Sequence, residues 1–358
     1  MNKSYNDLKN FWKNKKVFLT GHTGFKGTWL TIMLNMLEAK VAGYSLRPKK
    51  LSLFNQTKCS KLLKNNYFLD VNNLNTLKKK IKKTKPDIIF HLAAQPLVTL
   101  SFKKPVDTFQ TNVIGTLNLL EAAKNVKSVK SVVIITTDKV YKVNTTSKSY
   151  VETDELGGKD PYSASKACSE ILTNSYVLSF LNHSNLMTVS TARSGNVIGG
   201  GDYSKDRLVP DILESFNKNK ILAVRNPDHV RPWQHVIEPL YGYLLLAEKQ
   251  FLNQLSNLDH SWNFGPKKKS FISVKQVINK FRKKKLIKKI LIKKNKNIET
   301  KILTLNSNKA SKYLNWNQKW DIDQTLQKII EWNNIVNKKK NYREICENQI
   351  KEYLKNKL

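Results

Sequence analysis

The sequence contains few cysteines, no long apolar run and no sign of a secretion signal. Its three cysteines, Cys59, Cys168 and Cys346, are far apart and form no CxxC pair, so we expect neither a disulfide framework nor a metal site. No apolar run approaches the roughly 20 residues that span a bilayer, and residues 1–11 are polar, unlike a signal peptide. These absences predict a reduced, cytoplasmic protein without membrane contact.

Acidic residues are also scarce, and the resulting charge is large. The chain has 63 lysines and arginines against 27 aspartates and glutamates, which gives a formal net charge of +36. Such a balance favours a nucleic-acid binder. Only seven of the 63 basic residues are arginine, however, the side chain suited to bidentate contact with phosphates and bases. Lysine is spread with asparagine and isoleucine over the whole chain, as a codon bias would produce, so we expect no nucleic-acid partner.

Segments that avoid lysine stand out against this background. Three such segments are residues 91–102, 188–203 and 229–248. Four of the seven arginines fall within one span of 39 residues: Arg193, Arg207, Arg225 and Arg231. Either function or burial explains why these segments keep a different composition, and the sequence leaves both explanations open.

Short apolar runs alternate with segments of helical spacing over the first half of the chain. Strands are predicted at residues 16–20, 41–45, 67–70, 87–92, 131–136 and 186–192, and helices at 28–37, 74–81, 108–124 and 161–180. This alternation predicts an α/β fold with a Rossmann-type, doubly wound parallel sheet. We expect a dinucleotide-binding domain at residues 1–192 with a return segment around 232–260. Residues 193–231 and 261–358 are expected to form a smaller, mixed substrate-binding lobe over the carboxyl ends of the strands.

A glycine-rich loop, Gly21-His-Thr-Gly24-Phe-Lys-Gly27, lies between the first predicted strand and helix. Glycines there permit a tight turn and a close approach of the backbone to a pyrophosphate, which the helix N-terminus also attracts. The loop therefore predicts a nicotinamide dinucleotide. No acidic residue follows the second strand, where Arg47 stands instead, so NADP remains open beside NAD. Asp70 and Val71 end the third strand, where Asp70 either meets the adenine or caps the next helix.

The catalytic candidates are a tyrosine and a lysine four residues apart, Tyr162 and Lys166, on one face of a predicted helix. A nearby ammonium stabilises a phenolate, which can then take the proton of a hydroxyl group as hydride leaves its carbon. Thr137, Asp138 and Lys139 follow the fifth strand, at the edge of the sheet where catalytic groups lie. Thr137 can hydrogen-bond a substrate hydroxyl, and Asp138 and Lys139 are an acid and a base candidate. An ordinary polar turn is the alternative for these three residues.

Taken together, these motifs resemble the extended short-chain dehydrogenase/reductase family. More narrowly, the chain is similar to the nucleotide-sugar 4,6-dehydratases that act on CDP-glucose, from Phe11 to about Trp332, with a poor match at residues 267–301. The motifs that carry this resemblance are Gly-His-Thr-Gly-Phe-Lys-Gly from Gly21, Ala-Ala-Gln-Pro-Leu-Val from Ala93, Thr-Asp-Lys from Thr137, Gly-Asn-Val-Ile-Gly-Gly-Gly-Asp from Gly195, Arg-Pro-Trp-Gln-His-Val from Arg231 and Trp-Asn-Phe-Gly-Pro from Trp262.

The resemblance implies an NAD-dependent hydro-lyase that acts on a CDP-sugar as a homodimer, in the synthesis of deoxysugars for polysaccharides such as O-antigens. It implies transient oxidation at carbon 4, loss of water across carbons 5 and 6 with Asp138 as the acid, and return of hydride to carbon 6. The cofactor contacts it implies are Gly21, Thr23, Gly24, Phe25, Lys26, Gly27, Asp70, Val71, Leu92, Ala93, Ala94, Tyr162 and Lys166. Substrate contacts are expected from Gln95, Asn196, Arg207 and Arg231.

Several alternatives remain at this stage. Related dehydratases of dTDP-glucose and GDP-mannose have a glutamate where this chain has Lys139, so the base at carbon 5 is undecided. Nucleotide-sugar epimerases share the fold and the tyrosine, but a simple 4-epimerase needs no acid–base pair beyond Tyr162. A catalytically silent Rossmann protein with an RNA-binding surface is a third possibility. Binding that weakens steeply as salt rises would identify it.

Overall fold

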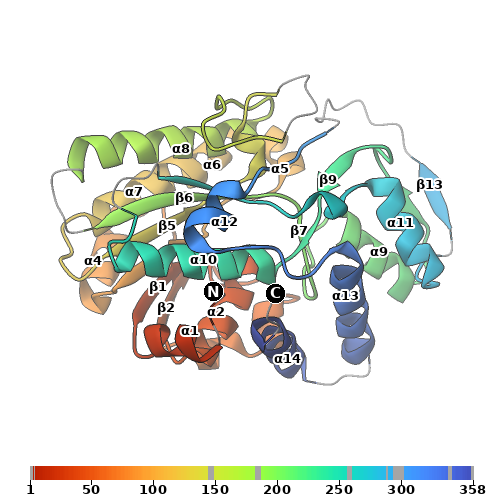
Figure 1. The fold of residues 1–358 in the computed structure, drawn as a ribbon, viewed down its shortest axis with the longest axis horizontal. Coiled ribbons are helices and arrows are strands. Elements are labelled where there is room, and N and C mark those ends of the chain that lie inside the picture. Colours follow the sequence, from red (N-terminus) through yellow and green to blue (C-terminus); the bar gives the residue numbers. More distant parts are fainter. Residues whose placement is uncertain are drawn as a thin grey trace.

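The structure is a computed structural model, and it describes residues 3, 5–143, 149–181, 187–255, 260–287, 289–292, 302–337 and 341–355. Its centre is a seven-stranded sheet in which every strand pairs with its neighbours in parallel (Figure 1). In spatial order the strands are β3 (Asn65–Phe68), β2 (Lys40–Ser45), β1 (Lys16–Thr20), β4 (Ile88–His91), β5 (Ser131–Ile135), β6 (Thr188–Ser194) and β11 (Ser261–Phe264). The order reverses between β1 and β4, the point at which such sheets bind ligands.

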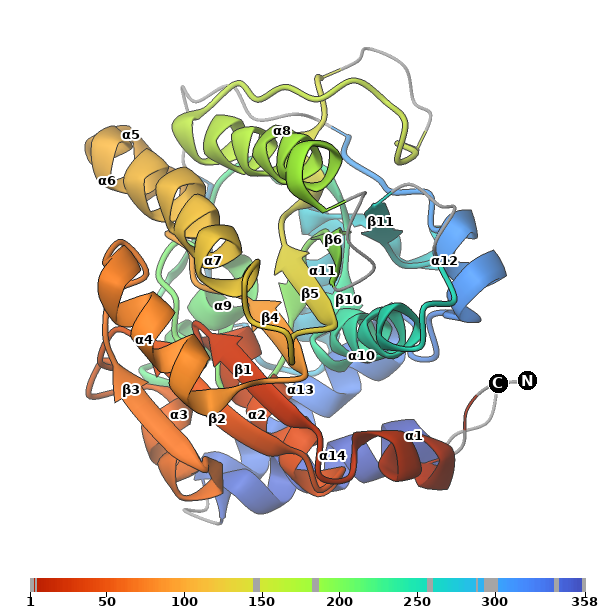
Figure 2. The same ribbon diagram turned by 90° about the vertical axis from the view of Figure 1, so that its left-hand side faces the viewer.

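Helices cover both faces of the sheet because alternate strand residues point to opposite sides. In β1, Val17 and Leu19 face one core cluster and Phe18 faces the other. The first cluster involves α1 (Tyr5–Trp12), α2 (Phe25–Met36), α10 (Ile237–Phe251), α12 (Asn308–Leu314) and α14 (Tyr342–Lys355). The second involves α4 (Leu74–Thr84), α7 (Gly115–Ala123) and α8 (Pro161–Phe180). Figure 2 shows α4, α7 and α8 along one side of the strands, with α2, α10 and α14 on the other.

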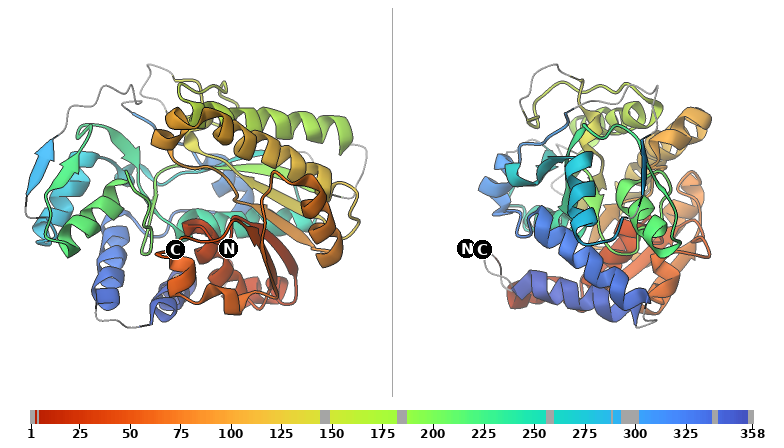
Figure 3. Two further views of the ribbon diagram at one scale, coloured as in Figure 1. Left: turned by 180° about the vertical axis from the view of Figure 1, so that it is seen from behind. Right: turned by 90° about the vertical axis from the view of Figure 1, so that its right-hand side faces the viewer.

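A second, smaller lobe has its own core at one end of the molecule (Figure 3, green to blue). It combines α9 (Leu208–Asn217), β8 (Leu222–Val224), α11 (Val274–Lys283), β13 (Ile290–Ile292) and α13 (Ile322–Asn337). Its strands form short pairs, β8 with β13 in parallel and β9 (Val230–Pro232) with β12 (Phe271–Ser273) antiparallel. A further parallel pair joins β7 (Val197–Ile198) to β10 (Gln234–His235).

The predicted fold class is confirmed, with local differences. Helix α2 begins at Phe25, three residues before the predicted start, because Gly24 is extended and serves as its N-cap. The helix predicted at 108–124 is three consecutive pieces: α6 (Pro105–Phe109), the π-helical turn η2 (Gln110–Ile114) and α7. The return to the main sheet reaches Phe264, because β11 pairs with β6. The remaining short helices are α3 (Leu53–Gln56), η1 (Cys59–Leu62), α5 (Val98–Lys103), η3 (Asp138–Val140) and η4 (Lys268–Ser270). Within the described residues, no helix has the length and apolar character needed to cross a bilayer.

Candidate active site

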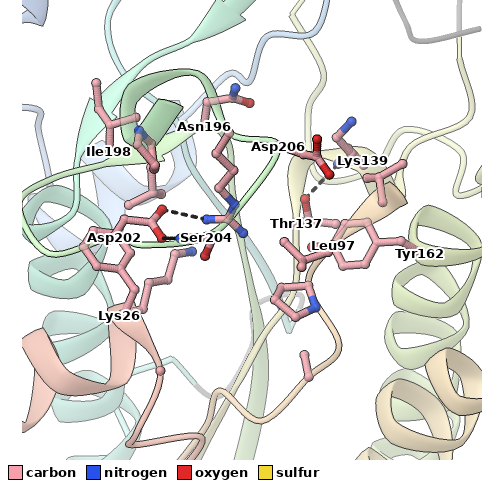
Figure 4. A pocket seen from close by; sticks show the side chains of 18 of the residues that line it. Lys26, Leu97, Thr137, Lys139, Tyr162, Asn196, Ile198, Asp202, Ser204 and Asp206 are labelled. Carbon is pink, nitrogen blue, oxygen red and sulfur yellow. Dashed lines mark hydrogen bonds and ion pairs between the residues drawn. The ribbon is translucent and has the colours of Figure 1, made fainter. Parts of the chain in front are cut away.

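A cavity of about 650 Å³ lies between the carboxyl ends of the central strands and the small lobe. Figure 4 shows that side chains from the glycine loop, from the end of β5, from α8 and from the small lobe point into it. The predicted site residues that line it are Gly21, Thr23, Gly24, Phe25, Lys26, Gly27, Asp70, Val71, Leu92, Ala93, Ala94, Thr137, Asp138, Lys139, Tyr162, Lys166, Asn196, Arg207 and Arg231. The structure thus gathers segments that are up to 210 positions apart, from Gly21 to Arg231, around one space.

The glycine loop is packed too tightly for any side chain at its first and last glycines. Gly21 has a φ of +72°, and a Cβ there would lie 2.6 Å from the backbone nitrogen of Ala93. A Cβ on Gly27 would lie 2.2 Å from the carbonyl oxygen of Gly21. The result is a bare backbone cradle at the N-terminus of α2, which fits the pyrophosphate of a dinucleotide.

The adenosine end of the cradle is formed by the ends of β2 and β3. The Thr23 and Ser45 hydroxyls lie 2.9 Å apart in a hydrogen bond, and the Arg47 guanidinium lies 5.1 Å from the centre of the Phe68 ring. Asp70 lines the cavity and accepts a hydrogen bond from the Asn72 backbone. The alternative that Asp70 caps the next helix is wrong, because Asn73 is the N-cap of α4.

Lys26 extends from the glycine loop across the cavity to the end of β6. Its Nζ donates a hydrogen bond of 2.9 Å to the Ser194 hydroxyl. Burial, helped by the nearby charge of Arg207, lowers the pKa of this ammonium to about 7. The amine therefore lies close to the reacting part of the cavity rather than only beside the dinucleotide cradle.

Tyr162 and Lys166 occupy one face of the first turns of α8. The helix starts where predicted, with Asp160 accepting a hydrogen bond from the Ser163 backbone and Pro161 at the first helical position. Burial raises the pKa of Tyr162 to about 12, and a hydrogen bond with Thr137 partly offsets this effect. Burial lowers the pKa of Lys166 to about 8, and its Nζ donates to the Ile135 carbonyl at 3.0 Å.

The Thr137–Lys139 segment forms the turn η3 directly after β5. The Thr137 hydroxyl donates to Oδ1 of Asp138 at 2.9 Å, whereas Oδ2 has no hydrogen-bond partner among the described residues. Only 2% of Asp138 is exposed, and burial raises its pKa although the charge of Lys139 opposes this. Gly195 faces Oδ2, since a Cβ there would lie 2.9 Å from it. A buried carboxyl group of raised pKa is not an ordinary polar turn, and it is suited to donate a proton.

Arginines of the predicted cluster have two different roles. Arg207, Arg225 and Arg231 line the cavity. Arg193 does not line it, because it forms a fully buried ion pair of 2.9 Å with Glu170 of α8. Three of these arginines thus line the cavity, whereas the fourth is held in the interior.

Each cavity-lining arginine already has a partner in the protein. Arg207 lies 3.2 Å from Asp202, and Arg225 lies 3.4 Å from Asp206. Arg231 is buried and donates to the Val230 carbonyl, with its second nitrogen 3.0 Å from Nδ1 of His229. These contacts fix the orientation of the guanidinium groups on the cavity wall.

Gln95 is the one predicted site residue that does not line the cavity. Its side chain donates to the Leu97 carbonyl and to Thr108, and accepts from the Leu97 backbone, so it stabilises the loop that follows β4. The structure also brings residues to the cavity that the sequence did not indicate. They are chiefly Thr99, Asp206, Asp211, Trp233 and Val274. Asp206 and Asp211 fall in the arginine-rich span, and Thr99 and Trp233 fall in the lysine-poor segments, which were the available signals.

Comparisons with known proteins agree with this geometry. The sequence matches the family described as GDP-mannose 4,6 dehydratase over residues 18–329. The CDP-glucose 4,6-dehydratase of Salmonella typhimurium is 40% identical over 336 residues, which cover 90% of this chain and 92% of that protein. UDP-glucuronic acid 4-epimerase from Bacillus cereus, in complex with UDP-glucuronic acid and NAD, superposes with a TM-score of 0.78 at 21% identity, covering 90% of this chain and 99% of that one. dTDP-glucose 4,6-dehydratase from Bacillus anthracis, in complex with NAD, gives 0.75 at 22% identity, covering 93% and 99%.

Proposed function

The chain belongs to the GDP-mannose 4,6-dehydratase family, and we propose on this basis that it dehydrates CDP-glucose to CDP-4-dehydro-6-deoxyglucose with NAD as its cofactor. The observation that carries the proposal is its 40% identity to a CDP-glucose 4,6-dehydratase along nearly the whole of both chains. The buried carboxyl group of Asp138, on the same cavity as Tyr162, supports dehydration over simple epimerisation. Oxidation at carbon 4 is common to both reactions, but only dehydration must expel a hydroxyl group.

The side chains of this cavity account for the proton transfers. NAD, which the loop of Gly21, Gly24 and Gly27 would hold, would supply the acceptor for the hydride of carbon 4 and the donor of the hydride that carbon 6 gains. Tyr162, which is hydrogen-bonded to Thr137, takes the proton of the 4-hydroxyl group. The ketone at carbon 4 then acidifies the proton on carbon 5, and Asp138 donates a proton to the departing 6-hydroxyl group, which leaves as water. Lys139 lines the same cavity and is the candidate base that removes the carbon 5 proton and gives it back when carbon 6 gains hydride.

The proposal is tested by incubating the protein separately with CDP-glucose, dTDP-glucose, UDP-glucose and GDP-mannose in the presence of NAD. We expect a 4-keto-6-deoxy product, identified by nuclear magnetic resonance, from CDP-glucose far faster than from the others. Interconversion of hexoses at carbon 4 without loss of water would instead identify an epimerase. Turnover of another nucleotide sugar at a higher rate would assign the chain to a different dehydratase.

Arg231 is expected to hold the diphosphate of the substrate. Arg231→Lys keeps the charge but loses the planar fork of donors, so we expect the KM for CDP-glucose to rise about tenfold or more while kcat changes little. The thermal unfolding midpoint should stay within a few degrees of the wild-type value. Arg282→Lys is a matched control, because Arg282 lies on α11 and does not line the cavity. An unchanged KM would assign Arg231 a structural role.

We also propose a homodimer formed through the helices on one face of the sheet. Helix α8 packs against α5, α6 and α7, and this layer exposes large apolar side chains that a monomer would leave in water. They are Phe102, Val106, Phe109, Ile114, Ile171, Leu178 and Phe180, which are 37–76% exposed.

A cytoplasmic location is proposed as well, since none of the three cysteines is in a disulfide, as is usual in a reducing compartment.

Charge introduced on this face should separate the protomers. Ile171 and Leu178 lie two turns apart on α8 and are 57% and 54% exposed. We expect the double variant Ile171→Glu and Leu178→Glu to sediment as a monomer at concentrations where the wild type is a dimer, because burying two carboxylates in an apolar contact is costly. Leu291→Glu, on β13 at the other end of the molecule, should leave the sedimentation coefficient unchanged. A wild-type protein that sediments as a monomer would contradict the proposed homodimer.

A further inference from the structure

The cavity continues beyond the catalytic side chains into the small lobe. Past Arg207 and Arg231, its far wall is formed by the first turns of α9 and by β8 with the two residues after it. The apolar parts of this wall are Ala223, Val224, Trp233 and Val274. Since the hexose must reach Tyr162 and the arginines suit a diphosphate, the nucleoside of the substrate extends to this far wall. Its apolar side chains fit the faces of a planar base.

Asp211 is a carboxylate on this wall without a partner. It lies on α9 one turn after Arg207, and its backbone N–H donates to the Arg207 carbonyl. It lines the cavity and is only partly exposed, yet its side chain makes no hydrogen bond or ion pair with any described residue. The neighbouring carboxylates differ, since Asp202 is paired with Arg207 and Asp206 with Arg225.

The surroundings of Asp211 favour a donor that comes from outside the protein. Burial, together with the negative charge of Asp206, raises the pKa of Asp211 to about 6, and Arg225 opposes this only in part. Asp211 is only partly exposed on this wall, and an ionised acceptor forms stronger hydrogen bonds than a neutral one. An N–H donor on the ligand would therefore be bound preferentially at this position.

The pyrimidine bases differ in their hydrogen-bond donors at carbon 4 and at the neighbouring nitrogen 3, and a carboxylate that faces carbon 4 distinguishes them by the group on that carbon. Cytosine carries an amino group on carbon 4, whereas uracil and thymine carry a carbonyl oxygen there. An ionised carboxylate can only accept hydrogen bonds, so it attracts the amino group and repels the carbonyl oxygen. We propose that Asp211 is a specificity-determining residue that accepts a hydrogen bond from the 4-amino group of cytosine and so selects cytidine nucleotides. This inference rests on the proposed function, because it specifies the base of the same substrate.

The decisive variant is Asp211→Asn, which has nearly the same shape. An amide can donate to the carbonyl oxygen of uracil as well as accept from cytosine. We expect the ratio of kcat/KM for CDP-glucose to that for UDP-glucose to fall at least about tenfold, the size expected when a hydrogen bond to a charged group is lost. Glu214→Gln is the matched control, because Glu214 lies on the same helix, is exposed and paired with Lys218, and does not line the cavity. It should keep the wild-type ratio.

Nucleotide binding gives a second readout that does not depend on turnover. The Kd values for CDP and UDP are measured by calorimetric titration of wild type, Asp211→Asn and Asp211→Ala. We expect the wild type to bind CDP more tightly than UDP. In both variants the ratio of the two Kd values should shrink at least about tenfold. Asp211→Ala supplies the result if the asparagine variant is not folded. A wild type that prefers CDP, with variants that keep this preference, would overturn the role of Asp211 alone. A wild type that neither turns over CDP-glucose nor prefers CDP would overturn the proposed function together with this inference.

Discussion

Tyr162→Phe is expected to lower kcat with CDP-glucose by at least about 10²–10⁴-fold, the loss typical of a general acid–base group. In this proposal the phenol takes the 4-hydroxyl proton, so the first oxidation should be slow without it. Burial raises the pKa of Tyr162 to about 12, so its phenolate must be stabilised by its surroundings. Thr137 and the charge of Arg207 both act in that direction, and the bound nicotinamide adds a positive charge.

Steady-state turnover and nucleotide affinity, measured together, separate this role from a structural one. The Kd for CDP should change little, since the phenol is not expected to contact the nucleotide. Tyr176→Phe is a matched control, because Tyr176 lies on the same helix, hydrogen-bonds Glu121 and lies away from the cavity. Near-normal turnover in Tyr162→Phe would remove Tyr162 from the mechanism.

The parts of the site that the sequence predicts well are those encoded within a few residues. A glycine loop between a strand and a helix lets the backbone approach a phosphate group closely, and the i,i+4 spacing of Tyr162 and Lys166 fixes their common face whatever surrounds them. The start of α8 is equally local, since Asp160 caps it and Pro161 is its first residue, as the predicted range of 161–180 requires. Such features depend on backbone geometry near in sequence, so pattern alone is sufficient.

Other features depend on contacts between distant segments, which a single sequence does not encode in a readable form. Arg193 and Arg231 are the same residue type within the same arginine-rich span of the chain. Only the approach of α8 to β6 makes Arg193 the partner of Glu170. Gln95 similarly belongs to a motif of the resemblance, yet its hydrogen bonds to Leu97 and Thr108 turn it away from the cavity.

The far wall of the cavity was missed for the same reason. It exists because β8 pairs with β13 across about 70 residues of chain and because α9 packs beside β8. Asp211 has no motif around it, and its importance comes from the absence of a partner rather than from any pattern. Burial of Asp138 is likewise a tertiary property, since the acidic character of a carboxyl group at neutral pH depends on how far it is removed from water.

Asp138→Asn is expected to uncouple oxidation from the loss of water. The amide keeps the shape of the side chain and can still accept the hydrogen bond from Thr137, but it has no acidic proton to give to the 6-hydroxyl group. Hydride removal at carbon 4 should continue, while elimination slows by about 10²-fold or more. In a single turnover with excess enzyme, the absorbance of reduced cofactor should therefore accumulate in the variant and remain low in the wild type.

The pH dependence of the same experiment adds an independent test. The pKa of Asp138 is raised, so the carboxyl group is protonated below that raised value and loses its proton as the pH rises through it. Elimination in the wild type should therefore slow as the pH rises through this value, and the variant should lack this dependence. Asp323→Asn, an exposed change on α13 away from the cavity, should behave as wild type. Elimination at the wild-type rate in Asp138→Asn would show that the proton comes from another group, and Lys26, whose pKa is lowered to about 7, would be the next candidate.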